Sequence, residues 1–180
     1  MQTRKKLLLH SCCAPCSSGV LEELIKLFDV TVFFYNPNIN TKEEYDKRAN
    51  HQKKLCDTLG VNCIITNYSP GNFSTATIGR EKDKEGGERC TLCFQIRLQQ
   101  TALYAKENGF DIFTTTLSVS PYKNAFLLNE IGNKISGENN IEYLEANFKK
   151  NNGYLKSIEN SKKFNLYRQK YCGCAFSLPV

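Results

Sequence analysis

The sequence predicts an α/β fold, in which a mostly parallel β-sheet carries helices on both faces. Three observations support this class. The 180 residues are close to the size of one domain, and 41% apolar with 23% charged residues is an ordinary globular composition. Short runs rich in β-branched and aromatic residues alternate with longer runs of helical periodicity. Helical crossovers of this kind join parallel strands and cover the sheet. We therefore expect a single domain over residues 1–180.

The elements follow one another in a regular order. We expect strands at residues 6–10, 30–35, 61–66, 111–117 and 141–144. We expect helices at residues 20–28, 41–59, 90–108, 122–131 and 154–163. Thr41 and Glu44 form a capping box for the second helix, and Gly60 closes it. Pro121 suits the first turn of the fourth helix, which Gly132 is expected to end.

Two segments have no strong periodicity. Residues 67–89 hold Ser, Asn, Gly and a charged run, and a connection of this length is often a functional arm. A solvated, mobile loop is the alternative, and the sequence does not decide between them. Residues 164–177, FNLYRQKYCGCAFS, form a C-terminal segment with two cysteines.

No segment is suited to a membrane. The longest apolar runs, such as residues 7–9 and 30–35, are far shorter than the ~20 residues needed to cross a bilayer. The basic start MQTRKKLLLH lacks the ~7–15 apolar residues of a secretory signal. The sequence therefore predicts a cytoplasmic protein.

Nine cysteines are unusual in such a chain, because cytosolic thiols are kept reduced and a dense set there indicates metal binding or redox chemistry. Cys56 and Cys63 lie in apolar stretches and are predicted to be core residues. The other seven form three groups: Cys12, Cys13 and Cys16; Cys90 and Cys93; Cys172 and Cys174.

The spacing within the groups limits their chemistry. The pair Cys90 and Cys93 suits zinc, an iron-sulfur cluster or a redox dithiol alike. Adjacent ligands at Cys12 and Cys13 are awkward for a zinc knuckle and easier for a polynuclear cluster. Cys172-Gly173-Cys174 can close a very small disulfide ring, which favours a redox-active pair, although further metal ligation stays open.

The two histidines contribute little to this chemistry. His10 ends the first strand, where we expect a half-buried ring satisfied by backbone groups. His51 lies among polar residues of a helix and is expected to be solvated.

The topology predicts where the groups meet. Ligands of open parallel sheets bind beyond the carboxyl ends of the strands. The polar and sulfur groups that follow successive strands are the first cysteine loop, Asn36 to Asn38, the 67–93 region, and Ser118 to Ser120 with Lys123. All of them should reach one edge of the sheet.

The charge balance suggests the partner. A net charge of +6 favours a polyanion. Basic residues crowd the last third of the chain and alternate with aromatic ones, which suits unstacked bases and phosphates. The run Tyr167-Arg168-Gln169, beside the proposed dithiol, is the strongest candidate for function there.

Five motifs in order complete the pattern: HSCCAPCS, YNPNI, ERCTLCFQIRL, TTTLSVSPYKN and LYRQKYCGC, from residue 10 to residue 174. Together they resemble the epoxyqueuosine reductases of the QueH family. The resemblance implies an adenine-nucleotide alpha-hydrolase-like (HUP) fold. It also implies reduction of the epoxide of epoxyqueuosine at the wobble position of a tRNA, the last step of queuosine biosynthesis.

The resemblance also implies roles for individual residues. Cys12, Cys13, Cys90 and Cys93 match ligands of a 4Fe-4S cluster, and Cys172 with Cys174 matches a redox-active disulfide. Cys16 matches the family's CCAPC element and is a candidate for a second iron. Asn40-Thr41 stands where the family is expected to read His-Pro, which puts only a minor contact in doubt.

The proposed reaction, a two-electron deoxygenation, needs further groups. The proton donor candidates are Tyr167, Tyr171, Lys123 and Glu88, and no cobalamin is expected. The electron donor is not identified. The residues expected to bind the tRNA nucleoside are Asn36, Asn38, Ser118, Ser120, Arg168 and Gln169.

Two alternatives remain. An adenylating tRNA-thiolation enzyme shares the fold and partner, but CCAPCSSG lacks the SGGxDS-type phosphate loop that such an enzyme needs. A zinc-stabilised RNA-binding module would use the same cysteines without catalysis.

Overall fold

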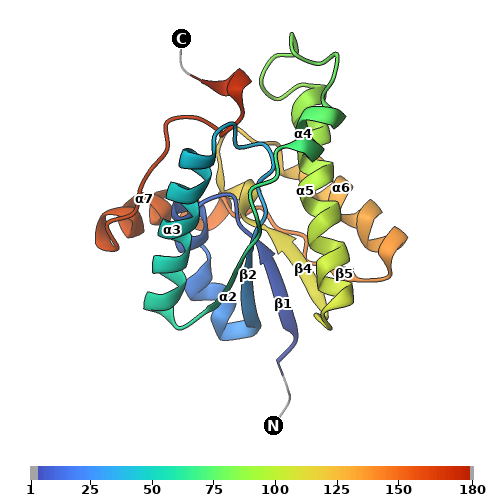
Figure 1. The fold of residues 1–180 in the computed structure, drawn as a ribbon. Helices are drawn as coiled ribbons and strands as arrows, with labels where there is room; N and C mark the ends of the chain where they lie inside the picture. Colours follow the sequence, from blue (N-terminus) through green and yellow to red (C-terminus); the bar gives the residue numbers. More distant parts are fainter. Residues whose placement is uncertain (1–3, 179–180) are drawn as a thin grey trace.

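The computed structural model describes residues 4–178 and contains one sheet of five parallel strands in the order β3-β2-β1-β4-β5 (Figure 1). The strands are β1 (Lys6–His10), β2 (Asp29–Phe34), β3 (Asn62–Ile65), β4 (Ile112–Thr115) and β5 (Glu142–Tyr143). The predicted α/β class with a parallel sheet is therefore confirmed.

Helices cover both faces of this sheet. They are α1 (Ala14–Ser18), α2 (Leu21–Leu27), α3 (Lys42–Leu59), α4 (Gly71–Ala76), α5 (Glu88–Glu107), α6 (Ala125–Asn139) and α7 (Gly153–Lys163). Three short 3-10 turns accompany them: η1 (Thr116–Val119), η2 (Lys150–Asn152) and η3 (Ala175–Ser177). None of the helices in the described range has both the length and the hydropathy needed to cross a bilayer.

The central strand shows why the sheet needs two helical layers. Leu7, Leu8 and Leu9 are all fully buried, since alternate side chains of a strand point to opposite faces. Leu8 packs in the core beneath α5 and α6. Leu7 and Leu9 pack in the core that α1, α2 and α3 cover. Strand β1 is thus buried on both sides, as parallel strands usually are.

The strand order determines where along the sheet a ligand is expected to bind. The chain runs from β1 outward to β2 and β3, then returns to the other side of β1 to form β4 and β5. The direction of winding therefore reverses at β1, and ligands of such sheets bind at this reversal, outside the carboxyl ends of the strands. The loops after β1 and β4 meet there.

The local capping signals hold for α3. The Thr41 hydroxyl accepts a hydrogen bond from the Glu44 N–H at 3.2 Å, and Gly60 adopts the left-handed conformation after the last turn. Cys56, as predicted, is fully buried in the core, and Cys63 packs half-buried against it.

The predicted helix at 122–131 is wrong in both bounds. Asn124 caps α6 by accepting hydrogen bonds from the N–H groups of Phe126 and Leu127, so Pro121 lies in the preceding turn. Gly132 does not end the helix but lies inside it. A Cβ atom there would be 2.3 Å from the ring of Tyr143, so glycine serves close helix-to-strand packing.

Two short helices lie in segments that we expected to be loops. The cysteine loop after β1 contains α1, which begins with Pro15 in its first turn. The 67–89 segment contains α4, whose Phe73 is buried beside Cys93 and Cys174. Both helices are too short for a periodic apolar pattern to reveal them.

The two glycines of α6 give a matched test of this packing. We expect Gly132→Ala to destabilise the protein by about 1–2 kcal/mol, because Tyr143 cannot move without leaving the core. Gly137→Ala meets no atom within 4 Å and should stabilise by up to ~1 kcal/mol through helix propensity. Urea midpoints of the two variants measure both effects, and equal midpoints would contradict this account of Gly132.

Candidate active site

A cavity of about 360 Å³ lies at the carboxyl edge of the sheet. The Cys12 N–H donates to the Thr116 hydroxyl at 3.2 Å, which ties the loop after β1 to the loop after β4. The volume falls in the range of small-molecule sites. Its sulfur-bearing and polar lining residues include Cys12, Cys13, Cys16, Arg97, Ser120, Lys123, Arg168, Gln169 and Cys172.

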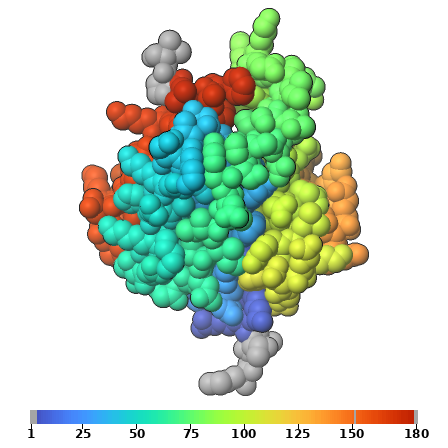
Figure 2. All heavy atoms as spheres, viewed as in Figure 1, coloured from blue at the N-terminus to red at the C-terminus, as the bar shows by residue number. Residues whose placement is uncertain are grey.

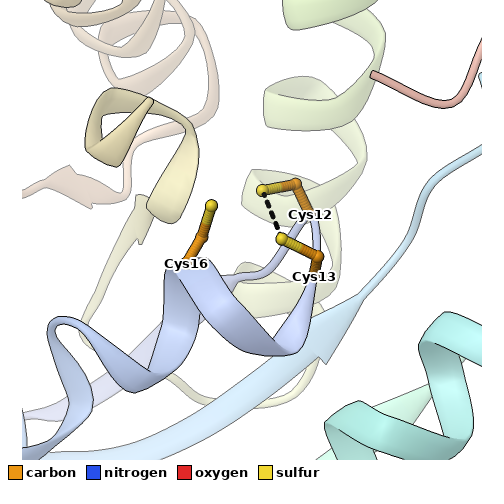
Figure 3. A group of neighbouring side chains, drawn as sticks. All are labelled: Cys12, Cys13 and Cys16. Carbon is orange, nitrogen blue, oxygen red and sulfur yellow. Dashed lines mark hydrogen bonds between the residues drawn. The ribbon is translucent and has the colours of Figure 1, made fainter. Parts of the chain in front are cut away.

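Three cysteine sulfurs point into the same space at the start of α1 (Figure 3). The Sγ atoms of Cys12, Cys13 and Cys16 all lie within 4.8 Å of one another, and those of Cys12 and Cys13 are 3.8 Å apart. Hydrogen bonds from Cys13 and Cys16 hold the pKa of Cys12 well below its usual value. The bond to Cys12 raises the pKa of Cys13 to about 11. The group therefore favours a thiolate at Cys12.

The other cysteine pairs line a smaller cavity beside the first. Cys90 and Cys93 lie on the first turns of α5, and Cys172 and Cys174 face them. Burial raises the pKa of Cys93 to about 11. Cys172 lines both cavities, so the three cysteine groups lie around two adjoining cavities. Within residues 4–178, however, the tight sulfur group holds only the three cysteines after β1.

A buried arginine stands between the cysteine groups. Arg97 on α5 is 1% exposed. Its guanidinium donates to Asn36 Oδ1 at 2.7 Å and to Cys93 Sγ at 3.7 Å. In the described part of the chain no carboxylate pairs with it. The charges of Cys93 and Cys12 raise its pKa against the opposing effect of burial. A buried cation of this kind requires nearby negative charge.

His10 is fully buried, not half-buried as expected, and lies behind this arginine. Its Nε2 lies 3.0 Å from the Tyr35 carbonyl, which can only accept a hydrogen bond, so the tautomer with the proton on Nε2 fits this contact and leaves Nδ1 to accept from the Thr115 hydroxyl at 2.8 Å. Burial, assisted by the charge of Arg97, lowers the pKa of His10 to about 3. The ring is therefore a neutral spacer between β1, β2 and β4.

The C-terminal cysteine pair rests on α3. Arg48, 2% exposed, forms an ion pair with Glu44 at 2.6 Å. It also donates to the backbone carbonyls of Cys172 at 2.9 Å and Tyr171 at 3.2 Å. Because the ion pair fixes the guanidinium, these carbonyls are held in one position.

Position 173, between the two cysteines, requires glycine because a side chain there would be strained and crowded. Its φ is 128°, and a Cβ atom would lie 3.1–3.2 Å from Ile39, Arg48 and Asn38. Its carbonyl accepts from the Asn40 N–H at 2.9 Å. The Cys-Gly-Cys segment is thus packed against the loop after β2.

The 67–89 arm and the C-terminal segment meet above the second cavity, as neighbouring projections in Figure 2. Arg89 donates to the carbonyls of Arg80 at 2.8 Å and Asp83 at 2.7 Å, and its guanidinium lies 4.5 Å from the Phe176 ring centroid. Glu85, in the same arm, lines both cavities.

Tyr167 is not among the residues that line either cavity. Its hydroxyl donates to the Glu44 carboxylate at 3.1 Å, and the Lys47 ammonium lies 3.7 Å from its ring centroid. Its N–H donates to His51 Nδ1 at 3.2 Å. His51 was expected to be solvated. It is instead partly buried and anchors the C-terminal segment.

Several predicted residues do line the main cavity. Tyr171 does so while its hydroxyl donates to Asn40 Oδ1 at 2.9 Å. The guanidinium of Arg168 donates to the Ser157 carbonyl at 3.0 Å. Oε1 of Gln169 is buried without a hydrogen-bond partner in the described range. That unpaired oxygen is available to a ligand.

Lys123 lines both cavities. Burial pulls its pKa down, but the charges of Cys172, Cys12 and Cys16 outweigh this effect and keep its pKa above the usual value. Ser120 lines the main cavity, and its hydroxyl accepts from the Tyr122 N–H at 3.3 Å.

The remaining predicted residues lie elsewhere. Asn36 supports Arg97 and donates to the Ser11 carbonyl at 2.9 Å, and the Ser118 hydroxyl accepts from the Phe148 N–H at 3.1 Å. Asn38 lines the second cavity, and its buried Oδ1 has no hydrogen-bond partner among residues 4–178. Glu88 forms an exposed ion pair and lines neither cavity.

Sequence reasoning missed four residues of this region: Arg97, Arg48, Glu85 and Tyr122. Arg97 had a detectable signal, since it lies four residues after Cys93 and hence on the same helix face. Arg48 had none, because its partners are backbone carbonyls of a segment more than 120 residues away.

Known proteins resemble this chain in sequence. Residues 7–179 match the family model described as epoxyqueuosine reductase QueH. The Staphylococcus epidermidis protein named epoxyqueuosine reductase QueH is 43% identical over 97% of this chain and 76% of its own length. The Thermotoga maritima protein of the same name is 35% identical over 96% of this chain and 90% of its own.

A solved structure shares the fold. The U34-tRNA thiolase NcsA from Methanococcus maripaludis, determined with its [4Fe-4S] cluster, aligns with a TM-score of 0.59 at 13% identity. The alignment covers 99% of this chain and 63% of the thiolase. At this identity the likeness concerns the fold alone.

The parallel sheet with a cysteine-lined cavity at its reversal point defines an α/β protein of the open, doubly wound class. Within that class, the chain belongs to the epoxyqueuosine reductase QueH family, whose members are named as oxidoreductases.

The contact between His51 and Tyr167 predicts a pH dependence. Burial, followed by the charges of Lys54 and Lys47, lowers the pKa of His51, so the folded chain binds this proton more weakly than the unfolded chain does. The stabilisation is present above about pH 6.5, the unperturbed value, and is lost as pH falls below it.

We expect the hydrogen-exchange protection factor of the Tyr167 amide to fall between pH 7.5 and 5.5, by no more than about tenfold per pH unit, the limit for one proton. His51→Asn retains an acceptor that does not titrate and should remove the dependence. A wild-type protection factor that stays constant over this range would contradict the assignment.

Proposed function

We propose that this protein reduces the epoxide of epoxyqueuosine at the wobble position of tRNA to queuosine, using an iron-sulfur cluster and the Cys172–Cys174 dithiol. The observation that carries the proposal is the meeting of three distant cysteine groups around one region at the reversal point of the sheet. Membership of the QueH family supports this activity. Both the tRNA substrate and the thiol chemistry suit a cytoplasmic location.

The cysteines and the arginine of the site suit an iron-sulfur cluster that carries negative charge. Iron-sulfur clusters are held by cysteine thiolates, and the proposed ligands are Cys12, Cys13, Cys90 and Cys93. Arg97, buried and without a carboxylate partner in the described range, lies beside two of these thiols. A cluster with four thiolates carries the negative charge that would balance it. When bound, such a cluster supplies electrons one at a time.

Cys16 is proposed to bind a second iron. Its sulfur lies within 4.8 Å of both Cys12 and Cys13. Tetrahedral coordination by thiolates at ~2.3 Å requires sulfur atoms ~3.8 Å apart. With Cys12 and Cys13 assigned to the cluster, Cys16 is the sulfur of this group that is left for a second iron. The same spacing would suit zinc in the non-catalytic alternative.

Oxidation of the proposed redox pair supplies the electrons and protons that reduction of the epoxide consumes. Cys172 and Cys174 lose two electrons and two protons as their S–S bond forms. The epoxide gains two electrons and two protons, loses its oxygen as water, and leaves a carbon–carbon double bond. A further dithiol or equivalent reductant then restores the two thiols. The Arg48–Glu44 ion pair holds the backbone at Cys172 for this cycle.

The protein groups that would orient the nucleoside surround the main cavity. Gln169 offers a buried oxygen that has no partner in the described part of the chain, and Arg168 and Ser120 lie in the same lining. Lys123 faces both cavities and is proposed to hold the proton for the leaving oxygen, ahead of Tyr171, whose hydroxyl already donates to Asn40.

Anaerobic reconstitution tests the function. We expect wild-type protein with a reductant to convert epoxyqueuosine to queuosine in tRNA, measured by nucleoside analysis. Cys90→Ala should lose both iron and turnover, whereas Cys172→Ala should keep the iron and its absorbance near ~400 nm but lose turnover.

Cys63→Ala, which removes a cysteine outside the site, is the matched control and should retain both properties. A colourless wild-type protein that binds zinc and makes no queuosine would refute the proposal in favour of the RNA-binding module. Loss of iron in Cys172→Ala would make that residue a ligand.

Arg97 gives an electrostatic prediction. Arg97→Gln removes a positive charge, so the more negative reduced cluster loses more stabilisation than the oxidised one. We expect the midpoint potential to fall by on the order of 100 mV, from one charge at an effective dielectric constant of about 20. Arg97→Lys should retain most of the wild-type potential. Redox titration monitored by electron paramagnetic resonance measures both, and an unchanged potential in Arg97→Gln would contradict the role.

A further inference from the structure

Two large aromatic residues near the start of α6 are exposed. Tyr122 is 83% exposed, and Phe126, four residues further along the chain, is 71% exposed. Single exposed apolar residues are common on protein surfaces and need no explanation. Tyr122, however, lines both the main cavity and the smaller one, so it stands where the two cavities adjoin.

The backbone that carries these rings is fixed on both sides. The Tyr122 N–H donates to the Ser120 hydroxyl, and Asn124 caps the start of α6. The ammonium of Lys149 donates to the Lys123 carbonyl in the intervening turn. The Tyr122 ring itself forms no aromatic pair or side-chain hydrogen bond within residues 4–178. A rigid turn thus exposes an aromatic ring that does not contribute to the packing of the described residues.

The surroundings of the ring are cationic. Lys123 is its neighbour in the chain, Lys149 contacts the same turn, and Lys170 lines the same cavity. Glu85, at the exposed tip of the arm, is the carboxylate in this lining. Aromatic rings beside ammonium groups match unstacked bases and their phosphates, and the chain carries a net charge of +6.

We propose that Tyr122 is a stacking platform for the anticodon-loop base next to the reacting nucleoside. This inference rests on the proposed function. An enzyme that works on one base must take it out of the stack. A main cavity of about 360 Å³ has room for that single nucleoside, which leaves the neighbouring base exposed at its mouth. An exposed ring at the mouth replaces the lost stacking partner.

The test measures the affinity of the full-length protein for an RNA hairpin with the sequence of the substrate anticodon arm. Tyr122→Ala should raise Kd about tenfold, as loss of one base–aromatic stack does, while Tyr122→Phe should stay within about twofold. Removing the neighbouring base from the hairpin, to leave an abasic site, should raise Kd by the same factor. Tyr122→Ala and the abasic site together should raise Kd no more than either change alone, because both remove the same contact.

Leu27→Ala is the control, since Leu27 is an exposed apolar residue, 67% exposed, on α2 and outside both cavity linings. It should leave Kd unchanged. An unchanged Kd in Tyr122→Ala, or additive losses in the double change, would overturn the proposal. Weaker reduction by a dithiol protein with unchanged RNA affinity would assign the surface to the electron donor and would also overturn it.

Binding and turnover separate the two proposals. A wild-type protein that makes no queuosine refutes the proposed reaction whatever Tyr122 does. A wild-type protein that makes queuosine, with Tyr122→Ala binding the hairpin normally, refutes only the stacking platform.

Discussion

The buried charge of Arg97 is the constraint on which the site depends. A guanidinium that is 1% exposed and has no carboxylate partner in the described range is costly unless negative charge lies close by. The structure surrounds it with sulfur from the loop after β1 and from α5, and with the amide oxygen of Asn36. His10 behind it is held neutral by the same burial. The site therefore favours negative charge near Arg97, and of the surrounding thiols it is Cys12 whose pKa is lowered.

The topology of the sheet makes this arrangement possible. Winding in opposite directions from β1 leaves the loops after β1 and β4 side by side with no strand connection between them. The first loop carries Cys12, Cys13 and Cys16, and the second carries Lys123. In a phosphate-binding relative of this fold class, backbone N–H groups would occupy the first position. Here thiols do, so this edge presents sulfur atoms in place of anion-binding N–H groups.

The C-terminal segment completes the site through α3 and the loop after β2. Arg48 holds the carbonyls at Tyr171 and Cys172, and Gly173 fits against Ile39 only because it has no side chain. Cys172 is thereby held where it lines both cavities, and Cys174 lines the smaller one together with Cys90, Cys93 and Lys123.

The sequence by itself determined the fold class, the order of the strands along the chain and the three cysteine groups, because strand and helix periodicity and short cysteine spacings are local properties. It also predicted the cap at Thr41 and Glu44 for the same reason. It placed the end of α6 wrongly at Gly132, since the contact with Tyr143 is not local.

Only the tertiary structure decided which residues share a cavity. Tyr167, adjacent in sequence to Arg168, turns away toward Glu44, while Tyr122 and Arg97 face the site. The reason is physical: a side chain's direction depends on the element that packs against it, and those partners lie as far as 124 residues away.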